Sequence, residues 1–167
     1  VSVDYATPLA GRQLQTTAYW FQYKLNLFSN FTYFLADPVN GDQFNQVDNR
    51  RFAGASIEHT FDSLQIFDRD STLTVGATTH HDWIEDIGLH KTSSRQRLRT
   101  VREDDIYEAS FSTHGNAKIT WNDWLRTETG LRADLFHFDV DARSLPENSG
   151  EKWDGIISPK AGLVLGP

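Results

Sequence analysis

The chain has 167 residues, of which 38% are hydrophobic, 13% aromatic and 23% charged, and this composition excludes a disordered protein. The formal net charge of −7 argues against a nucleic-acid surface, because phosphate binding depends on an excess of clustered Lys and Arg. Cysteine is absent, which excludes disulfides and thiolate metal sites.

Alternation of apolar and polar residues predicts β-strands along the whole chain, with no segment of helical period. The expected strands are 1–7, 12–34, 50–61, 71–83, 105–120, 124–141 and 156–165. The expected connections at 8–11, 62–70 and 122–123 are short or moderate, and those at 36–49, 84–104 and 142–155 are long and polar. If consecutive strands are antiparallel, this strict alternation places every long loop at one end of the sheet. We therefore predict an all-β fold of antiparallel up-and-down strands that forms a segment of a transmembrane β-barrel.

Hydropathy is compatible with that prediction. No apolar run approaches the roughly 18 residues of a membrane helix, and the first residues carry no signal-peptide pattern. Barrel strands cross a membrane with only about 10 residues of alternating polarity, so their average hydropathy is low. A helical membrane protein is therefore not expected, whereas a membrane barrel is.

The alternation divides each predicted strand into two faces. In the longest strand, Thr17, Tyr19, Phe21, Tyr23, Leu25 and Leu27 form one face, and Ala18, Trp20, Gln22, Lys24 and Asn26 form the other. Later strands repeat the pattern with apolar faces at Leu73, Val75 and Ala77, at Tyr107, Ala109 and Phe111, and at Leu131, Ala133 and Leu135. The same alternation also fits a soluble or surface-exposed β-sandwich that binds carbohydrate or a protein partner.

Four segments resemble consecutive stretches of the barrel of TonB-dependent receptors. They are NLFSNFTYFLADPVNGDQFNQVDNRR (26–51), LRTVREDDIYEAS (98–110), WLRTETGLRADLFHFDV (124–140) and NSGEKWDGIISPKAGLVLGP (148–167). The most specific elements are LFSNFTYFL…DPVNGDQF and the succession of GLR.D.F.F.V and SPK.GL. The resemblance runs from about residue 17 to the end of the chain.

This resemblance implies a barrel of about 22 strands, with a plug inside it, in the outer membrane of a Gram-negative bacterium. Such receptors take up scarce ligands, typically ferric siderophores, with energy delivered through TonB. Residues 1–167 contain about seven strands and neither plug nor TonB box, so we expect a middle part of the barrel, truncated at both ends. The implied partners are outer-membrane lipid, TonB through the missing plug and a small-molecule ligand, with no nucleic acid and no cofactor. A non-transporting barrel, such as an adhesin or a structural porin, is an alternative.

In such a wall one face of the longest strand meets lipid. We expect Tyr19, Phe21, Tyr23, Leu25 and Leu27 to face lipid, and Gln22, Lys24 and Asn26 to face the lumen. The lumen is also expected to hold a ladder of charges on Glu108, Arg126, Glu128, Arg132 and Asp134, which either pair across strands or contact a plug or ligand.

Two clusters are candidates for ligand contact in the external loops. HHDWIEDIGLH places His80 and Asp82 on one strand face, but its spacing matches no standard zinc motif, so we expect a solvated loop and no metal. Arg95, Arg97 and Arg99 would attract an anionic siderophore or the phosphates of surface lipid. No nucleophile elbow or phosphate loop occurs, so an enzyme is not expected.

Overall fold

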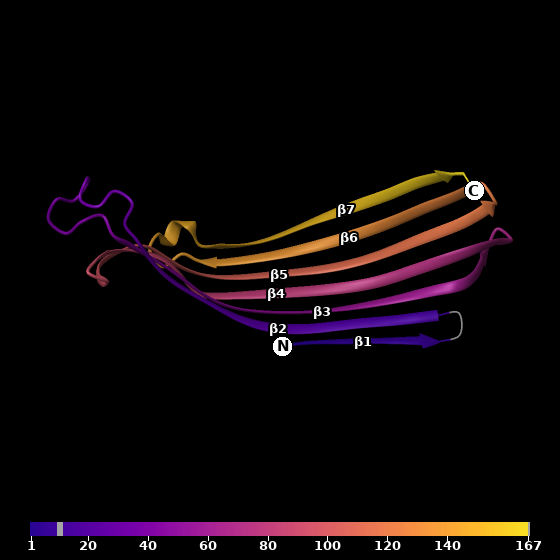
Figure 1. Cartoon of the computed structure of the whole chain (residues 1–167), viewed down its shortest axis with the longest axis horizontal. Coiled ribbons are helices and arrows are strands. Elements are labelled where there is room, and N and C mark those ends of the chain that lie inside the picture. Colours follow the sequence, from indigo (N-terminus) through magenta and orange to yellow (C-terminus); the bar gives the residue numbers. More distant parts are fainter. Residues whose placement is uncertain (10–11, 167) are drawn as a thin grey trace.

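The computed structural model describes residues 1–9 and 12–166 and consists of one antiparallel sheet (Figure 1). Its strands are β1 (Ser2–Leu9), β2 (Arg12–Ser29), β3 (Phe44–Ile66), β4 (Arg69–Ser93), β5 (Gln96–Asn122), β6 (Leu125–Asp141) and β7 (Gly150–Leu165). One short 3-10 helix, η1 (Pro146–Asn148), lies between β6 and β7. The strand order in the sheet is the order in the chain, and each neighbouring pair is antiparallel. The predicted all-β, up-and-down fold is confirmed.

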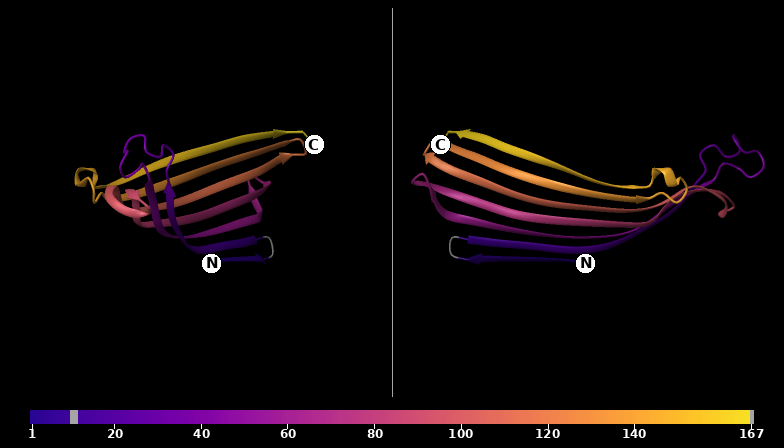
Figure 2. Two further views of the ribbon diagram at one scale, coloured as in Figure 1. Left: turned by 60° about the vertical axis from the view of Figure 1, so that its left-hand side comes forward. Right: turned by 180° about the vertical axis from the view of Figure 1, so that it is seen from behind.

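The sheet is open, because β1 and β7 each pair with one neighbour only. Loop 30–43, the β4–β5 hairpin and segment 142–149 gather at one end, here called the loop end (Figures 1 and 2). The β3–β4 and β5–β6 turns lie at the opposite end, here called the turn end (Figures 1 and 2). Residues 10 and 11 of the expected 8–11 connection lie outside the described residues.

The long loop expected at 84–104 is wrong. β4 continues to Ser93 and β5 begins at Gln96, so a two-residue turn joins them. Both turn residues have positive φ, 49° at Ser94 and 65° at Arg95. Two consecutive positive φ values give a turn whose twist matches that of antiparallel strands, and the charged stretch after it is therefore held in the ladder.

The same turn geometry shortens the connection expected at 62–70. Phe67 and Asp68 have φ values of 54° and 56°, and they alone separate β3 from β4. By contrast, the strand expected at 12–34 ends early, at Ser29, and residues 30–43 form a true loop. The last strand begins at Gly150 and not at residue 156.

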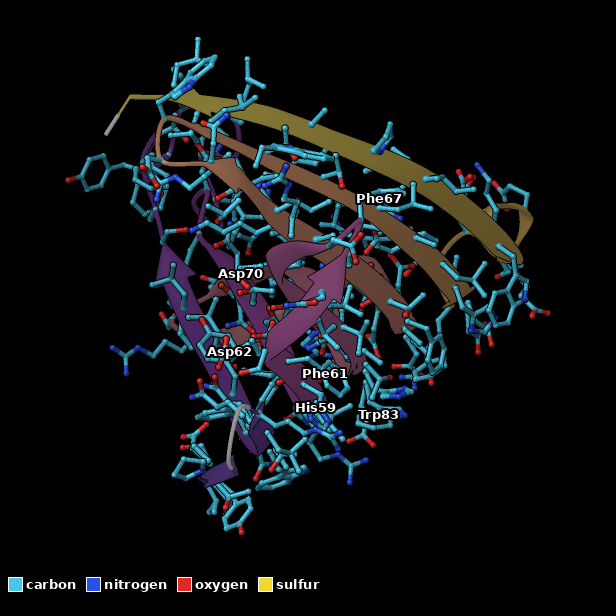
Figure 3. The ribbon with its side chains drawn as sticks, turned by 90° about the vertical axis from the view of Figure 1, so that its right-hand side faces the viewer. His59, Phe61, Asp62, Phe67, Asp70 and Trp83 are labelled. Carbon is cyan, nitrogen blue, oxygen red and sulfur yellow. The ribbon has the colours of Figure 1, made fainter. Side chains whose placement is uncertain are left out.

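The sheet is a single layer with almost no interior. Among the described residues, only four apolar side chains are buried: Ile84, Ala109, Ile119 and Ala142. Side chains project from both sides of the curved ribbon, and Phe67 lies at the turn end (Figure 3). A β-sandwich packs a second sheet against the first about 10 Å away, and the described residues supply only one sheet.

Candidate functional site: two faces and a loop end

Cross-strand register determines which residues share a face of the sheet. Trp20 is opposite Ala53, which is opposite His81, and this level continues through Ala109, His137 and Trp153. Residues directly opposite one another in an antiparallel ladder point to the same side. Each such level therefore crosses the whole sheet.

One side, here called the apolar face, contains no ionisable Asp, Glu, Lys or Arg at four successive levels. Within the described part of the chain these are the levels of Val75, Ala77, Thr79 and His81 on β4. Its large apolar members are Val3, Tyr5, Leu14, Trp20, Ile57, Val75, Phe111, Leu131, Leu135, Trp153 and Ile157. Many are widely exposed, with Phe111 at 42% and Ile157 at 69%. The face is thus a continuous apolar band across all seven strands.

The opposite side, here called the polar face, carries charges at the intervening levels. They are Asp4, Glu58, Asp82, Glu108, Arg132, Asp134, Lys152 and Asp154. Several are paired within the sheet: Arg50 lies 2.6 Å from Asp48 and 3.1 Å from Asp82. Arg132 donates to Asp134 at 2.7 Å and to the Ser112 hydroxyl at 2.9 Å. The sheet therefore has one face suited to an apolar medium and one suited to water.

The expected face assignment of β2 does not agree with this register. Tyr19, Phe21, Tyr23, Leu25 and Leu27, expected to face lipid, lie on the polar face with His80 and Asp82. Tyr19 Oη is 2.8 Å from His80 Nδ1, and the Phe21 ring stacks on Phe52 at 5.3 Å. Ala18 and Trp20 are the β2 residues that join the apolar band. The alternation within β2 is as expected, and its register places these five side chains on the face opposite the apolar band.

Aromatic rings border the apolar band at both ends. Toward the loop end, His81 stacks on Trp83 at 5.6 Å, Trp83 on Tyr107 at 5.8 Å, and His137 on Trp153 at 4.2 Å. Toward the turn end, His59 stacks on Phe61 at 4.2 Å (Figure 3). About ten residues of strand separate the levels of Phe61 and Trp83, the length with which a tilted barrel strand crosses a bilayer.

His80 and Asp82, two of the candidate ligand contacts, lie on one face of β4 as expected. Both side chains form hydrogen bonds with residues of neighbouring strands: His80 bonds to Tyr19, and Asp82 accepts from Arg50. Asp82 is buried, and one of its carboxylate oxygens has no hydrogen-bond partner among the described residues. No group of three or more metal-ligating side chains comes together in the described residues.

The other candidates, Arg95, Arg97 and Arg99, lie at the tip of the β4–β5 hairpin. The Arg95 guanidinium lies 5.6 Å from the centre of the Phe28 ring, and Arg97 is 3.7 Å from Glu103. About twelve residues of strand separate this tip from His80, or roughly 40 Å. The structure therefore does not bring His80 and Asp82 together with these arginines.

A hollow of about 460 Å³ opens on the polar face below the loop end. It is lined by Leu25, Gln46, Val47, Asp48, Ile87, Gly88, Leu89, Arg102, Asp104 and Ile106. Sequence reasoning missed it because most of its lining, residues 46–48 and 87–104, was expected in loops. Apolar runs among these charged residues were the available signal.

Loop 30–43 was also missed as an ordered unit. The Asp42 carboxylate is buried and accepts hydrogen bonds from Thr32 Oγ1 at 2.8 Å and from the backbone N–H groups of Ala36 and Asp37 at 2.9 and 2.8 Å. These bonds hold the pKa of Asp42 below its ordinary value, chiefly through the Ala36 N–H. The carboxylate is therefore ionised at neutral pH and organises the loop.

No family model matches the chain, and no curated protein matches it. The described residues include no helix long and apolar enough to cross a membrane.

Proposed function

We propose that this sheet is a section of the wall of a transmembrane β-barrel, and that the complete barrel is a TonB-dependent receptor of a bacterial outer membrane. The observation that carries the proposal is the four-level apolar band without Asp, Glu, Lys or Arg, opposite a charged face. Barrel walls have this asymmetry, with an apolar outer band between aromatic girdles and a polar interior.

A membrane accounts for the exposed apolar band better than water does. Soluble monomers rarely expose contiguous apolar patches beyond a few hundred Å², and this band extends over seven strands. In lipid the same surface is stable, because neighbouring strands satisfy each other's backbone groups. The unpaired edges of β1 and β7 require further strands, since open edges do not occur within the hydrocarbon layer.

The transport function is inferred from the resemblance together with the polar face. In a receptor wall this face lines the lumen, and the loop end lies on the cell exterior. The complete protein would take up a scarce ligand such as a ferric siderophore, with energy from TonB through its plug. The paired charges on the polar face fit a lumen that contacts water and polar groups.

Lipid contact is tested by depth-dependent fluorescence quenching. In the complete barrel, with its native Trp residues replaced by Phe, a single Trp is placed either at Phe111 or at Ser112. These neighbours lie on opposite faces of β5. In vesicles with brominated acyl chains, the Trp at 111 should be strongly quenched and the Trp at 112 only weakly.

Equal quenching at both positions, or a folded monomer in plain buffer that ignores vesicles, would contradict the membrane assignment. Transport itself is tested in the complete receptor, by uptake of radiolabelled ferric siderophore with and without TonB. Uptake that is unchanged when TonB is removed would indicate a passive barrel. No uptake under either condition would indicate a non-transporting barrel.

A further inference from the structure

The hollow on the polar face lies at a bulge in β4. Ile84 is opposite Arg50 and Ile87 is opposite Asp48, with a register shift between these two levels. Side chains three residues apart normally point to opposite faces, but the extra residue of the bulge turns Ile84 and Ile87 to the same side. The polar face is therefore partly apolar on the loop-end side of the bulge. The other apolar residues of the lining on this face are Leu25, Leu89 and Ile106.

Two carboxylates interrupt this apolar lining. Asp48 and Asp104 are opposite Ile87 on its two neighbouring strands. Asp104 is only 3% exposed, and its Oδ2 accepts a hydrogen bond from Arg102 Nε. Its Oδ1 has no hydrogen-bond partner among the described residues. A buried carboxylate oxygen without a donor is unfavourable, so the hollow is suited to a group that donates hydrogen bonds.

Asp134 shows what a fully satisfied carboxylate of the same kind is like. Arg132 and Asp134 have the same spacing as Arg102 and Asp104, and they also lie on the polar face. Both Asp134 oxygens accept from Arg132, and Oδ1 also accepts from Ser112 Oγ. Asp104 differs because it keeps one free oxygen and lines a hollow of about 460 Å³. This difference points to a ligand at Asp104.

The charges around the hollow favour a cation. Six ionisable groups of β2 to β6 lie on the polar face at the levels of Asp82, Ile84, Ile87 and Leu89. The carboxylates are Asp48, Asp82, Asp104 and Glu108, and the guanidinium groups are Arg50 and Arg102. Arg50 pairs with both Asp48 and Asp82, and Arg102 pairs with Asp104. Four carboxylates against two guanidinium groups leave two negative charges in excess.

We propose that this hollow binds a small organic cation, an ammonium group on an apolar body. The ammonium group donates to Asp104 Oδ1, and the body packs against Leu25, Ile87 and Ile106. The inference rests on the proposed receptor function, in which the polar face lines the lumen and is reached from the cell exterior. It places a site of definite charge on the barrel wall, between the loops and the apolar band.

The test uses the complete barrel in detergent micelles and three probes of similar shape, with binding measured by calorimetry against protein-free micelles. Cyclohexylmethylammonium is a cation, cyclohexylmethanol is neutral and cyclohexanecarboxylate is an anion. The ammonium probe should bind about 10-fold more tightly than the alcohol. Asp104→Asn should weaken its binding about 10-fold. Leu25→Trp, which fills the hollow without changing a charge, should abolish binding.

Asp134→Asn is the matched control. It alters an Arg–Asp pair of the same spacing that lies about nine residues of strand, or roughly 30 Å, from Asp104. It should leave the affinity for the ammonium probe unchanged.

Four results would overturn the inference: no binding of the ammonium probe, equal affinity for the alcohol, tighter binding of the carboxylate, or an equal loss in Asp134→Asn. The quenching experiment at positions 111 and 112 tests the membrane wall independently. Strong quenching at position 111 without binding of the ammonium probe would therefore reject the cation site alone.

Discussion

The two faces of the sheet are built from the same strands with the same alternation, yet they differ in the kind of side chain that neighbouring strands place at the same level. On the apolar face no Asp, Glu, Lys or Arg interrupts the four levels from Val75 to His81 in the described chain. On the polar face each strand adds polar or charged groups, several of them paired. The comparison shows that a face acquires its character from cross-strand register, which no single strand reveals.

A charge placed on either face should break this comparison most strongly. Ala77→Lys puts an ammonium group into the apolar band, whereas Thr78→Lys puts it on the polar face of the same strand. In a bilayer, Ala77→Lys should cost about 2–4 kcal/mol of the free energy of unfolding and Thr78→Lys much less. Denaturant unfolding in lipid vesicles measures both.

The result distinguishes an apolar band that faces lipid from one that faces water. Ala77 is exposed on this face. If the face were in water, a lysine at this position would change the free energy of unfolding by only about 0.5 kcal/mol. Equal costs for the two variants would therefore contradict the assignment of the apolar band to lipid.

The second prediction concerns the aromatic side chains on the polar face. The Tyr19 ring lies over Gly54 to reach His80, and a Cβ at Gly54 would overlap the Tyr19 hydroxyl and lie 2.8 Å from the Thr79 carbonyl oxygen. Gly54→Ala should therefore destabilise the sheet by about 1–3 kcal/mol. Gly115→Ala is the control, because its nearest neighbour would be Val75 Cγ1 at 4.0 Å.

Thermal unfolding in micelles compares the two variants. Loss of stability in Gly54→Ala with none in Gly115→Ala would show that β2 presents Tyr19 to the polar face. Equal stability of both variants would mean that Tyr19 does not cover Gly54, and the face assignment of β2 would have to be reconsidered.

The sequence predicted seven strands, their antiparallel order and the alternation within each, because period-2 patterning depends only on local geometry. The prediction of a long loop at 84–104 failed at the loop end of β4 and β5. Ser94–Arg95 adopts a turn with two positive φ values but contains neither Gly nor Asn, the residues that usually signal it. The charged residues that follow were consequently assigned to a loop.

The face that β2 shares with its neighbours could not be predicted from the sequence, for a different reason. Tyr19 and Phe21 are large and apolar enough to suggest lipid contact, but they fill gaps over Gly54 and against Phe52 on the polar face. Only the residues of the neighbouring strands show whether such a ring is exposed to lipid or packed over the sheet. For loop 30–43, only a long polar connection was predicted, because the burial of Asp42 depends on Thr32 and on backbone N–H groups that no pattern identifies.

A smaller effect is expected from Asp42→Asn, which replaces a charged acceptor by an amide. The hydrogen bonds from the Ala36 and Asp37 N–H groups should weaken, which lowers the local stability of loop 30–43 by about 1–2 kcal/mol. Amide hydrogen exchange should therefore accelerate at these residues and not in the β2–β3 ladder. Asp62→Asn, an exposed carboxylate near the turn end (Figure 3), should leave the loop unchanged.

The smallest effect is a pH dependence of the β4–β5 hairpin through His90. This side chain is completely buried, neither ring nitrogen has a hydrogen-bond partner among the described residues, and burial lowers its pKa below the ordinary value of 6.5. Arg97 also lowers the pKa, and Glu103 and Asp86 oppose the shift.

Because the unfolded hairpin takes up this proton more readily than the folded one, the contribution of His90 to stability is complete above about pH 6.5. It should decline as the pH falls below 6.5 and stop declining below the lowered pKa of the folded state. Between pH 7 and 5.5 the expected loss is up to about 1 kcal/mol, seen as faster amide exchange near the hairpin tip. His90→Asn should remove this slope. A slope that persists in the variant would assign it to other groups, and the hairpin would then depend on its ion pairs more than on the burial of a neutral imidazole.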